Sequence, residues 1–149
     1  MAEPQVTFEL PVDAKAIAEF AAAVGEDNTI YFDPEAAGAI GLPAVVAPPT
    51  FSMRQAFAVT RDEREERLGT RLEPGRVLHG EQEFLYRRLP FAGEVLKGTL
   101  RVAEDFTKEG RRGGRLRFVT YESRFTDSEG AEVLTARYTL IETTRDPGA

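Results

Sequence analysis

The sequence predicts an α+β domain in which helices come first along the chain and an antiparallel sheet follows. Apolar residues before about residue 60 recur at helical spacing, whereas those beyond Arg76 alternate with polar residues at the period of a strand. Clusters of turn-forming residues separate the alternating segments, at 90–93, 108–114 and 126–130. This order of elements indicates one sheet wrapped around a central helix.

The chain is expected to begin with a short strand and a well-delimited helix. Residues 5–10 alternate weakly, as a strand does. Asp13 is a favoured N-cap, and Gly25 is a favoured residue just beyond a helix C-terminus. We therefore expect a helix over about 13–24. Its apolar face has members at i, i+3, i+4 and i+7, which are Ile17, Phe20, Ala21 and Val24.

A second, short helix is expected where Asp33 precedes Pro34, because this pair combines an N-cap with proline at the first helical position. It should end near Gly41, and a loop over 42–49 should follow.

The central helix is expected from Thr50 to about Val59, because this segment is apolar and Pro48-Pro49 can open a helix but cannot lie inside one. Nearly every side chain from 60 to 66 is charged. That composition is typical of a solvated helix end or an exposed loop.

Four segments of the second half are expected to form strands of an antiparallel meander. Apolar residues alternate along each of them, as at Leu96, Leu100 and Val102. The segments are 76–89, 94–104, 114–126 and 132–143, and residues 145–149 are expected to be a frayed tail.

Size and composition exclude several classes of protein. At 149 residues and 16.5 kDa, we expect residues 1–149 to form a single domain. The net charge of −6 opposes nucleic-acid binding, which depends on neutralising phosphates. No apolar run approaches the roughly 18–20 residues that span a bilayer, and the first residues lack a secretory signal, so we expect no membrane partner and a cytoplasmic protein. Without cysteine and with one histidine, the chain is expected to hold neither a metal nor another cofactor.

Two segments carry a family resemblance. Residues 25–34 read Gly-Glu-Asp-Asn-Thr-Ile-Tyr-Phe-Asp-Pro, and residues 41–50 read Gly-Leu-Pro-Ala-Val-Val-Ala-Pro-Pro-Thr. The first segment resembles the Asp-x-Asn-Pro-x-His-x-Asp motif of the MaoC-like (R)-specific enoyl-thioester hydratases and 3-hydroxyacyl dehydratases. From about residue 5 to 143, including the strand that starts at His79, the order of elements resembles the N-terminal, FAS1-like dehydratase domains of that family. The resemblance implies the hotdog fold and an accessory-subunit variant.

The resemblance also implies a chemistry that this chain has altered. In the family, an Asp and a His hold and exchange protons with the added water, and a backbone amide at the start of the central helix binds the thioester oxygen. Here Glu26 stands at the Asp position and Tyr31 at the His position. A phenol is a poor base near neutral pH. Pro48 stands at the oxyanion glycine position and has no N–H to donate. We therefore expect no independently catalytic residue.

The same resemblance implies contacts with a bound acyl thioester. These are expected from Asn28, Tyr31, Ala47, Pro48, Thr50 and Phe51.

Several of these residues have simpler explanations. Asn28 and Asp33 can be turn and cap residues, and Tyr31 can place its ring in the core with its hydroxyl on a backbone partner. His79 can be an ordinary strand residue rather than a source of residual activity. The arginines around Gly113-Gly114 can meet the phosphates of CoA or an acidic carrier protein, or can be a solvated hairpin that protects the sheet edge. These arginines are Arg111, Arg112, Arg115 and Arg117.

The functional hypothesis is a non-catalytic, acyl-chain-binding subunit of a heteromeric enoyl-CoA hydratase or 3-hydroxyacyl-thioester dehydratase, paired with a catalytic MaoC-like partner. Its ligand would be the thioester of CoA or of acyl carrier protein. A homodimeric acyl-CoA-binding protein and a hotdog thioesterase remain alternatives. The thioesterase is less favoured, because the expected central helix offers Ser52, Arg54 and Gln55 but no carboxylate.

Overall fold

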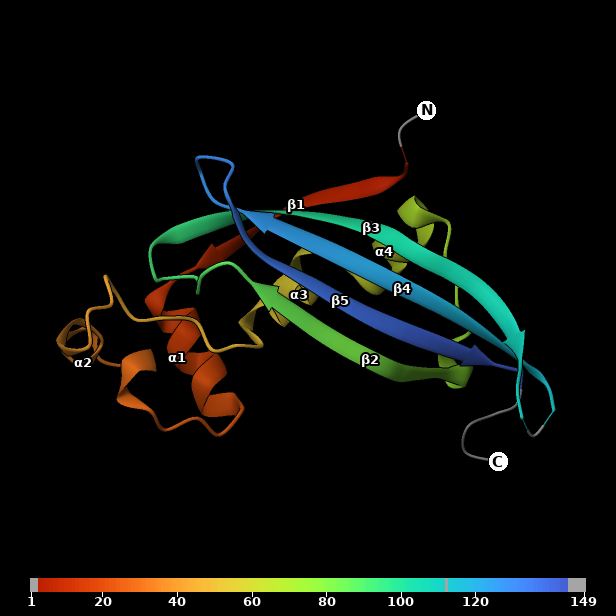
Figure 1. Cartoon of the computed structure of the whole chain (residues 1–149), viewed down its shortest axis with the longest axis horizontal. Helices are drawn as coiled ribbons and strands as arrows, with labels where there is room; N and C mark the ends of the chain where they lie inside the picture. The colour runs from red at the N-terminus through yellow and green to blue at the C-terminus, as the bar shows by residue number, and fades with distance from the viewer. Residues whose placement is uncertain (1–2, 112, 145–149) are drawn as a thin grey trace.

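The computed structural model describes residues 3–111 and 113–144, which form an α+β hotdog fold: a curved, five-stranded antiparallel sheet with helices on one side (Figure 1). In this view α3 and α4 lie behind the sheet, and α1 and α2 lie beyond one end of it. The strands are β1 (Gln5–Val12), β2 (Val77–Tyr86), β3 (Glu94–Glu109), β4 (Arg115–Thr126) and β5 (Glu132–Thr143). The helices are α1 (Ala14–Ala23), α2 (Pro34–Ala39), α3 (Gln55–Ala58) and α4 (Arg61–Leu68), with short 3₁₀ helices η1 (Thr29–Tyr31), η2 (Phe51–Arg54) and η3 (Pro74–Arg76).

The first helices form where their caps predict them. Asp13 accepts a hydrogen bond from the Ala16 N–H at 2.8 Å, and Asp33 accepts one from the Glu35 N–H at 2.9 Å. Gly25 and Gly41 follow the two helices with φ angles of 78° and 83°. A residue with a side chain rarely adopts this left-handed conformation, so glycine ends both helices here.

The strand order β1-β3-β4-β5-β2 corrects the expectation of a simple meander. β3, β4 and β5 do follow one another, but β2 pairs with β5 rather than with β3. The segment after β2 does not turn back tightly. Instead, its Pro90 carbonyl accepts from the Ala47 N–H at 2.9 Å, and Phe91 forms an isolated bridge with Val46. The connection is therefore held by the 45–47 loop and delivers β3 next to β1.

The central helix is shorter and more broken than expected. A 3₁₀ turn, η2, precedes α3, and Val59 is extended, with φ −129° and ψ 106°. The chain then re-enters a helix, α4, capped by the Thr60 side chain. The prediction that 60–66 is only a solvated helix end or loop is wrong for this reason. Glu65 is buried, and the Arg64 side chain is 14% exposed.

Two cores lie between the helices and the sheet. The first core packs beneath α1 and around Phe51, and the second packs beneath α4. The first contains Leu10, Val12, Ala16, Ile17, Ala37, Val45, Ala47, Phe51, Leu96, Phe125, Val133, Leu134 and Ala136. The second contains Val6, Val59, Leu68, Leu72, Leu100, Val119, Tyr121 and Tyr138.

Arg64 makes the second core partly polar. Its guanidinium lies 4.6 Å from the centre of the Tyr121 ring and donates to the Tyr138 hydroxyl at 3.0 Å. Tyr121 in turn donates to the Thr70 hydroxyl at 2.7 Å. These bonds fix α4 to β4 and β5.

Within the described residues, no helix combines the length and the apolar character needed to cross a bilayer.

Candidate functional site

The turn after α1 positions Glu26, Asn28 and Tyr31. The Gly25 and Glu26 N–H groups donate back to Ala22 and Ala21, at 3.2 and 2.9 Å, which closes the helix. The Asn28 side chain then accepts from the Ile30 N–H at 3.1 Å and caps η1. Asn28 is therefore a cap, as its simpler explanation held, and its amide nitrogen remains available at the surface.

Glu26 and Tyr31 lie close enough to interact electrostatically. Burial raises the pKa of Tyr31 above its ordinary value, and the Glu26 carboxylate raises it further. The ring packs against the first core, while Glu26 is exposed. At neutral pH the phenol is therefore protonated. It can donate a hydrogen bond, but it cannot act as the proton acceptor.

The loop before η2 forms the opposite side of the candidate site. Ala47 and Pro48 are buried, and Thr50 is exposed. The Ala92 N–H donates to the Val45 carbonyl at 2.9 Å, and the Tyr86 hydroxyl donates to the Pro49 carbonyl. Burial raises the pKa of Tyr86 to about 12, so this donor stays protonated. The end of β2 thus holds the start of the central helix in place.

Two prolines limit the backbone N–H donors at this helix start. Pro48 and Pro49 have no N–H, and the Phe51 N–H donates to the Pro48 carbonyl at 2.9 Å. Among the described residues, the Thr50 N–H donates to no backbone acceptor. A ligand oxygen bound at this helix start would therefore accept a hydrogen bond from the Thr50 N–H, because position 48 has no N–H to donate.

Tyr86 is the functional neighbour that sequence reasoning missed. Its position at the end of a strand gave no local signal, because its partner Pro49 is far away in the sequence. Phe51, expected from the sequence to contact the acyl thioester, lies in the core next to this region. It is 1% exposed and packs edge to face on Phe20, with ring centres 5.6 Å apart.

His79 lies apart from this group. It is on β2, seven residues from Tyr86, and its ring stacks on Tyr138 with centres 6.4 Å apart. Within residues 3–111 and 113–144, its ring makes no hydrogen bond. The expected ordinary hydrogen bonds are replaced by this stacking.

The hairpin arginines also have separate positions. Arg117 is paired with Asp105 at 2.6 Å and donates to the Arg71 carbonyl at 3.2 Å. Arg111 and Arg115 are exposed, and Arg112 lies outside the described residues.

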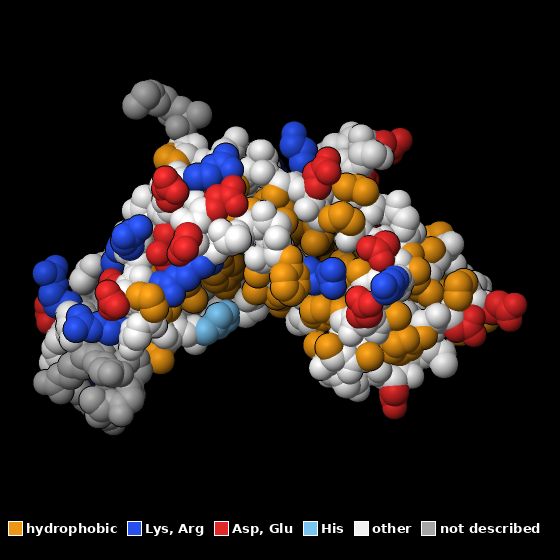
Figure 2. All heavy atoms as spheres, turned by 180° about the vertical axis from the view of Figure 1, so that it is seen from behind, with side chains coloured by type: hydrophobic (Ala, Val, Ile, Leu, Met, Phe, Trp, Pro, Cys, Tyr) orange, Lys and Arg blue, Asp and Glu red, His pale blue; other side chains and the backbone are white. Residues whose placement is uncertain are grey.

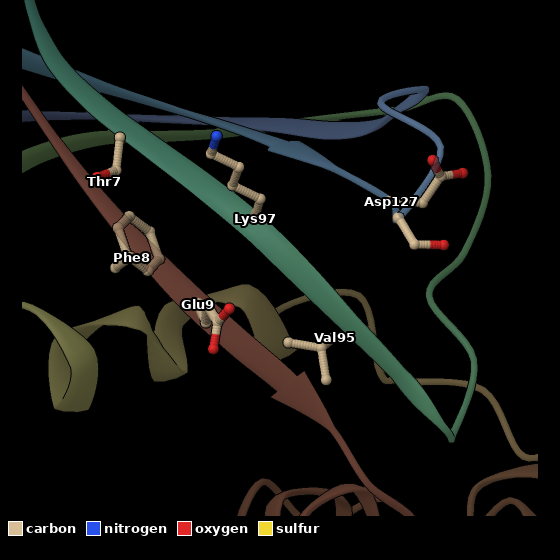
Figure 3. Close-up of a pocket in the computed structure, with 7 residues that line it drawn as sticks. Thr7, Phe8, Glu9, Val95, Lys97 and Asp127 are labelled. Carbon is tan, nitrogen blue, oxygen red and sulfur yellow. The ribbon is translucent and has the colours of Figure 1, made fainter.

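A hollow of about 580 Å³ on the outer face of the sheet is unrelated to this site (Figure 3). Thr7 and Glu9 of β1 line it, with Val95 and Lys97 of β3 and Asp127 of the β4–β5 turn. Asp127 is already paired with Arg88 at 3.2 Å, and Glu9 and Lys97 are opposite each other in the strand register. The charged side chains that line this hollow are therefore already paired with, or lie opposite, other charged side chains of this chain. Across the described part of the chain, no group of His, Cys, Asp and Glu is arranged to hold a metal ion.

Comparison with known proteins settles the family. Residues 4–136 match the model of the FAS1-like dehydratase domain region. This chain belongs to that family. A UPF0336 protein of Clavibacter michiganensis is 44% identical to it over 131 residues, which cover 87% of this chain and 83% of the relative. A second UPF0336 protein, from Saccharopolyspora erythraea, is 37% identical over 91% of this chain and 85% of its own length.

Solved structures agree with the hotdog architecture of this FAS1-like dehydratase domain. A chain of the C-terminally truncated HadBC (3R-hydroxyacyl-ACP dehydratase) complex from Mycobacterium tuberculosis superposes with a TM-score of 0.71 at 26% identity, over 95% of this chain and 98% of that one. A MaoC-like dehydratase superposes with a TM-score of 0.79, also at 26% identity, over 99% of this chain and 44% of that protein. The resemblance to the MaoC-like family is thus confirmed.

Proposed function

We propose that this chain is a non-catalytic subunit of a heteromeric (R)-specific enoyl-thioester hydratase or 3-hydroxyacyl-thioester dehydratase, in which it forms part of the surface that binds the acyl chain. The state of Tyr31 carries the proposal. At the position of the family's proton-transferring histidine, the chain has a phenol whose pKa is raised by burial and by Glu26. A general base needs a pKa near the working pH, and this group has the opposite shift.

The free edge of β2 supports assembly with a second hotdog subunit. In the part of the chain that the structure describes, β2 pairs only with β5, so its other edge presents unpaired backbone groups. Phe57 on α3 is 83% exposed, and Leu85 on β2 is 53% exposed. Figure 2 views the molecule from the helix side of the sheet and shows hydrophobic side chains gathered along a hollowed surface. Such a surface beside an open edge favours a protein partner.

Charge on β2 favours a different subunit over a second copy. Glu81 and Glu83 are exposed on the same side of the strand, near its middle. If two copies of β2 paired antiparallel about their centres, these carboxylates would lie beside their own counterparts, which is unfavourable. A partner strand with basic or neutral residues at these positions avoids this repulsion.

The proposal is tested by reconstitution. The chain would be co-purified with a hotdog protein of the same organism that retains the family's Asp and His, and loss of the conjugated thioester absorbance of crotonyl-CoA would be followed. We expect no turnover by this chain alone and a rise in activity of the complex over the partner alone. Brisk hydration by the isolated chain, or no gain on mixing, contradicts the proposal. Release of free thiol from acyl-CoA would instead favour the thioesterase.

A matched pair of variants sharpens this test. Tyr31→Phe removes only the hydroxyl, so we expect the complex to keep its pH profile. Tyr31→His in this chain, together with Glu26→Asp, introduces the family's side chains. If the wild-type phenol already moved protons, Tyr31→Phe would abolish the activity contributed by this subunit.

A further inference from the structure

A second hollow lies at the end of the sheet opposite the candidate site and is rich in arginine. It has a volume of about 370 Å³ and lies between η3 and the β3–β4 hairpin. Three arginines, three threonines and one carboxylate line it: Arg76, Arg115, Arg117, Thr107, Thr143, Thr144 and Glu142. Figure 2 shows basic side chains at this end of the molecule, at left, with acidic ones among them. A local excess of positive charge is notable in a chain with a net charge of −6.

Two of the three guanidinium groups have unused hydrogen-bond donors. Arg117 is held by Asp105 and by the Arg71 carbonyl, so its role is structural. By contrast, Arg76 and Arg115 are exposed, and their side chains make no hydrogen bond or ion pair among residues 3–111 and 113–144. Glu142 is partly occupied, because its carboxylate accepts from the Glu73 N–H at 2.6 Å. The hollow therefore offers two free guanidinium forks, which match the geometry of phosphate oxygens.

The hollow lies too far along β2 to serve this chain's own candidate site. Arg76 immediately precedes Val77, the first residue of β2, whereas Tyr86, the last, holds Pro49 at the site. The ten residues of β2 span about 30 Å at about 3.3 Å per residue. If β2 pairs antiparallel with the edge of a second hotdog subunit, however, the Val77 end of this chain lies beside the site end of that subunit.

We propose that Arg76 and Arg115 form an anion subsite that binds phosphate oxygens of the thioester's carrier while the acyl group occupies the site of the partner subunit. This inference rests on the proposed function and gives the non-catalytic chain a positive role in substrate binding. The phosphates can come from the nucleotide of CoA or from the phosphodiester of a phosphopantetheine arm. Both sources present the same tetrahedral anion to the two arginines.

The test compares three ligands that share pantetheine and differ in the phosphates and the nucleotide attached to it. Binding of CoA, 4′-phosphopantetheine and pantetheine to the purified chain would be measured by calorimetry at low salt, with amide chemical shifts to locate the contact. We expect CoA to bind at least about tenfold more tightly than pantetheine, with shifts at Thr107 and Thr144, because the charge-assisted bonds need phosphate. Preference for 4′-phosphopantetheine over pantetheine would identify the 4′-phosphate as sufficient. If 4′-phosphopantetheine and pantetheine bind equally well while CoA binds more tightly, the nucleotide carries the phosphates that the arginines bind.

A charge-matched control separates the subsite from a general loss of positive charge. Arg76→Gln/Arg115→Gln should erase the preference for CoA without unfolding the chain, since neither side chain has a partner among the residues that the structure describes. Lys15→Gln/Arg124→Gln removes the same charge from α1 and from the outer face of the sheet, where these residues are 85% and 65% exposed, and should keep the preference. Equal affinity of the wild-type chain for CoA and pantetheine, or an unchanged preference in the Arg76/Arg115 variant, overturns the inference. Neither result depends on turnover, so failure of the proposed function would be seen separately, in the reconstitution assay.

Discussion

The core beneath α1 and the core beneath α4 lie on the same face of one sheet, yet they differ in polarity, because the second packs the Arg64 guanidinium against two tyrosines. Around Phe51 the clustered buried hydrophobic side chains are aliphatic or phenylalanine, beside the buried polar Ser52 and Gln55. The ionic cluster of Arg88, Glu94 and Asp127 stays at the margin, where the β2–β3 connection meets the β4–β5 turn. Around Tyr121 the guanidinium of Arg64 is packed inside. The first core therefore depends on shape, and the second depends also on directional bonds.

This difference between the cores suits the two ends of the molecule to different functions. A core built mainly of aliphatic side chains and phenylalanine suits the end where an acyl chain is proposed to bind, since apolar side chains can repack around chains of different length. A bonded core suits the end that holds the hairpin and the proposed anion subsite in a fixed position. The following predictions test this contrast, from the largest expected effect to the smallest.

Phe51→Ala should destabilise the chain most, by about 3–5 kcal/mol, because it leaves a cavity in the core that depends on shape. The free energy of unfolding from urea titration measures this. Phe57→Ala is the matched control, since Phe57 is a phenylalanine of the next helix that is 83% exposed. A loss for Phe51→Ala below about 1 kcal/mol would show that the first core tolerates a cavity better than proposed.

Arg64→Met should cost about 1–3 kcal/mol, because the Tyr138 hydroxyl loses its buried partner. Burial already raises the pKa of Tyr138, and the Arg64 charge opposes that rise. The variant should therefore titrate Tyr138 at a higher pH still, as read from its ultraviolet absorbance.

The double variant Arg64→Met/Tyr138→Phe should recover part of that loss, because both partners become apolar. Strict additivity of the two single changes would mean that the second core does not depend on this bond.

Arg88→Met should have a smaller effect that depends on pH. Burial raises the pKa of Glu94, but the hydrogen bonds from Arg88 and from the Phe91 N–H outweigh it, so the pKa is lowered overall. The Ala131 N–H and Arg88 likewise lower the pKa of Asp127. Folded pKa values below the unfolded ones give stability that is present above about pH 4.5 and is lost as the pH falls through the folded values. The melting temperatures of wild type and variant should thus differ at pH 7 and converge near pH 2. A difference that is constant with pH would contradict this account.

Phe57→Ala should leave the stability of the isolated chain within about 0.5 kcal/mol of wild type, because an exposed side chain loses little on truncation. Its effect should appear instead in the affinity for the partner subunit, measured by analytical ultracentrifugation of the mixture. Unchanged affinity would remove Phe57 from the proposed contact.

The contrast between the cores also shows what the sequence could and could not predict. Asp13, Gly25 and Asp33 act within a few residues, so the first two helices were predicted closely. The pairing of β2 with β5 joins residues far apart in the sequence, such as Tyr86 and Leu134, and alternation alone does not specify such a partner. The family resemblance singled out Glu26 and Tyr31, which lie close enough to interact electrostatically. The contact of Tyr86 with Pro49 had no signal in either segment.

α4 was missed although its signals were present. Thr60 and Glu63 have the spacing of a capping box, and the Thr60 hydroxyl accepts from the Glu63 N–H at 3.3 Å. Gly69 ends the helix with φ 66°. The run of charges concealed these signals, because composition does not reveal that Arg64 points between two tyrosines that lie on strands much later in the chain.

The open edge of β2 has a consequence for how the protein is made. If the chain is synthesised before its partner subunit is available, the edge of β2 stays exposed. Its backbone can then pair with any other extended peptide, including peptides of aggregating proteins. Glu81 and Glu83 slow such encounters between identical copies, but Leu85 does not. We therefore expect a larger fraction of the chain to be insoluble when it is overproduced by itself than when both proteins are translated from one message.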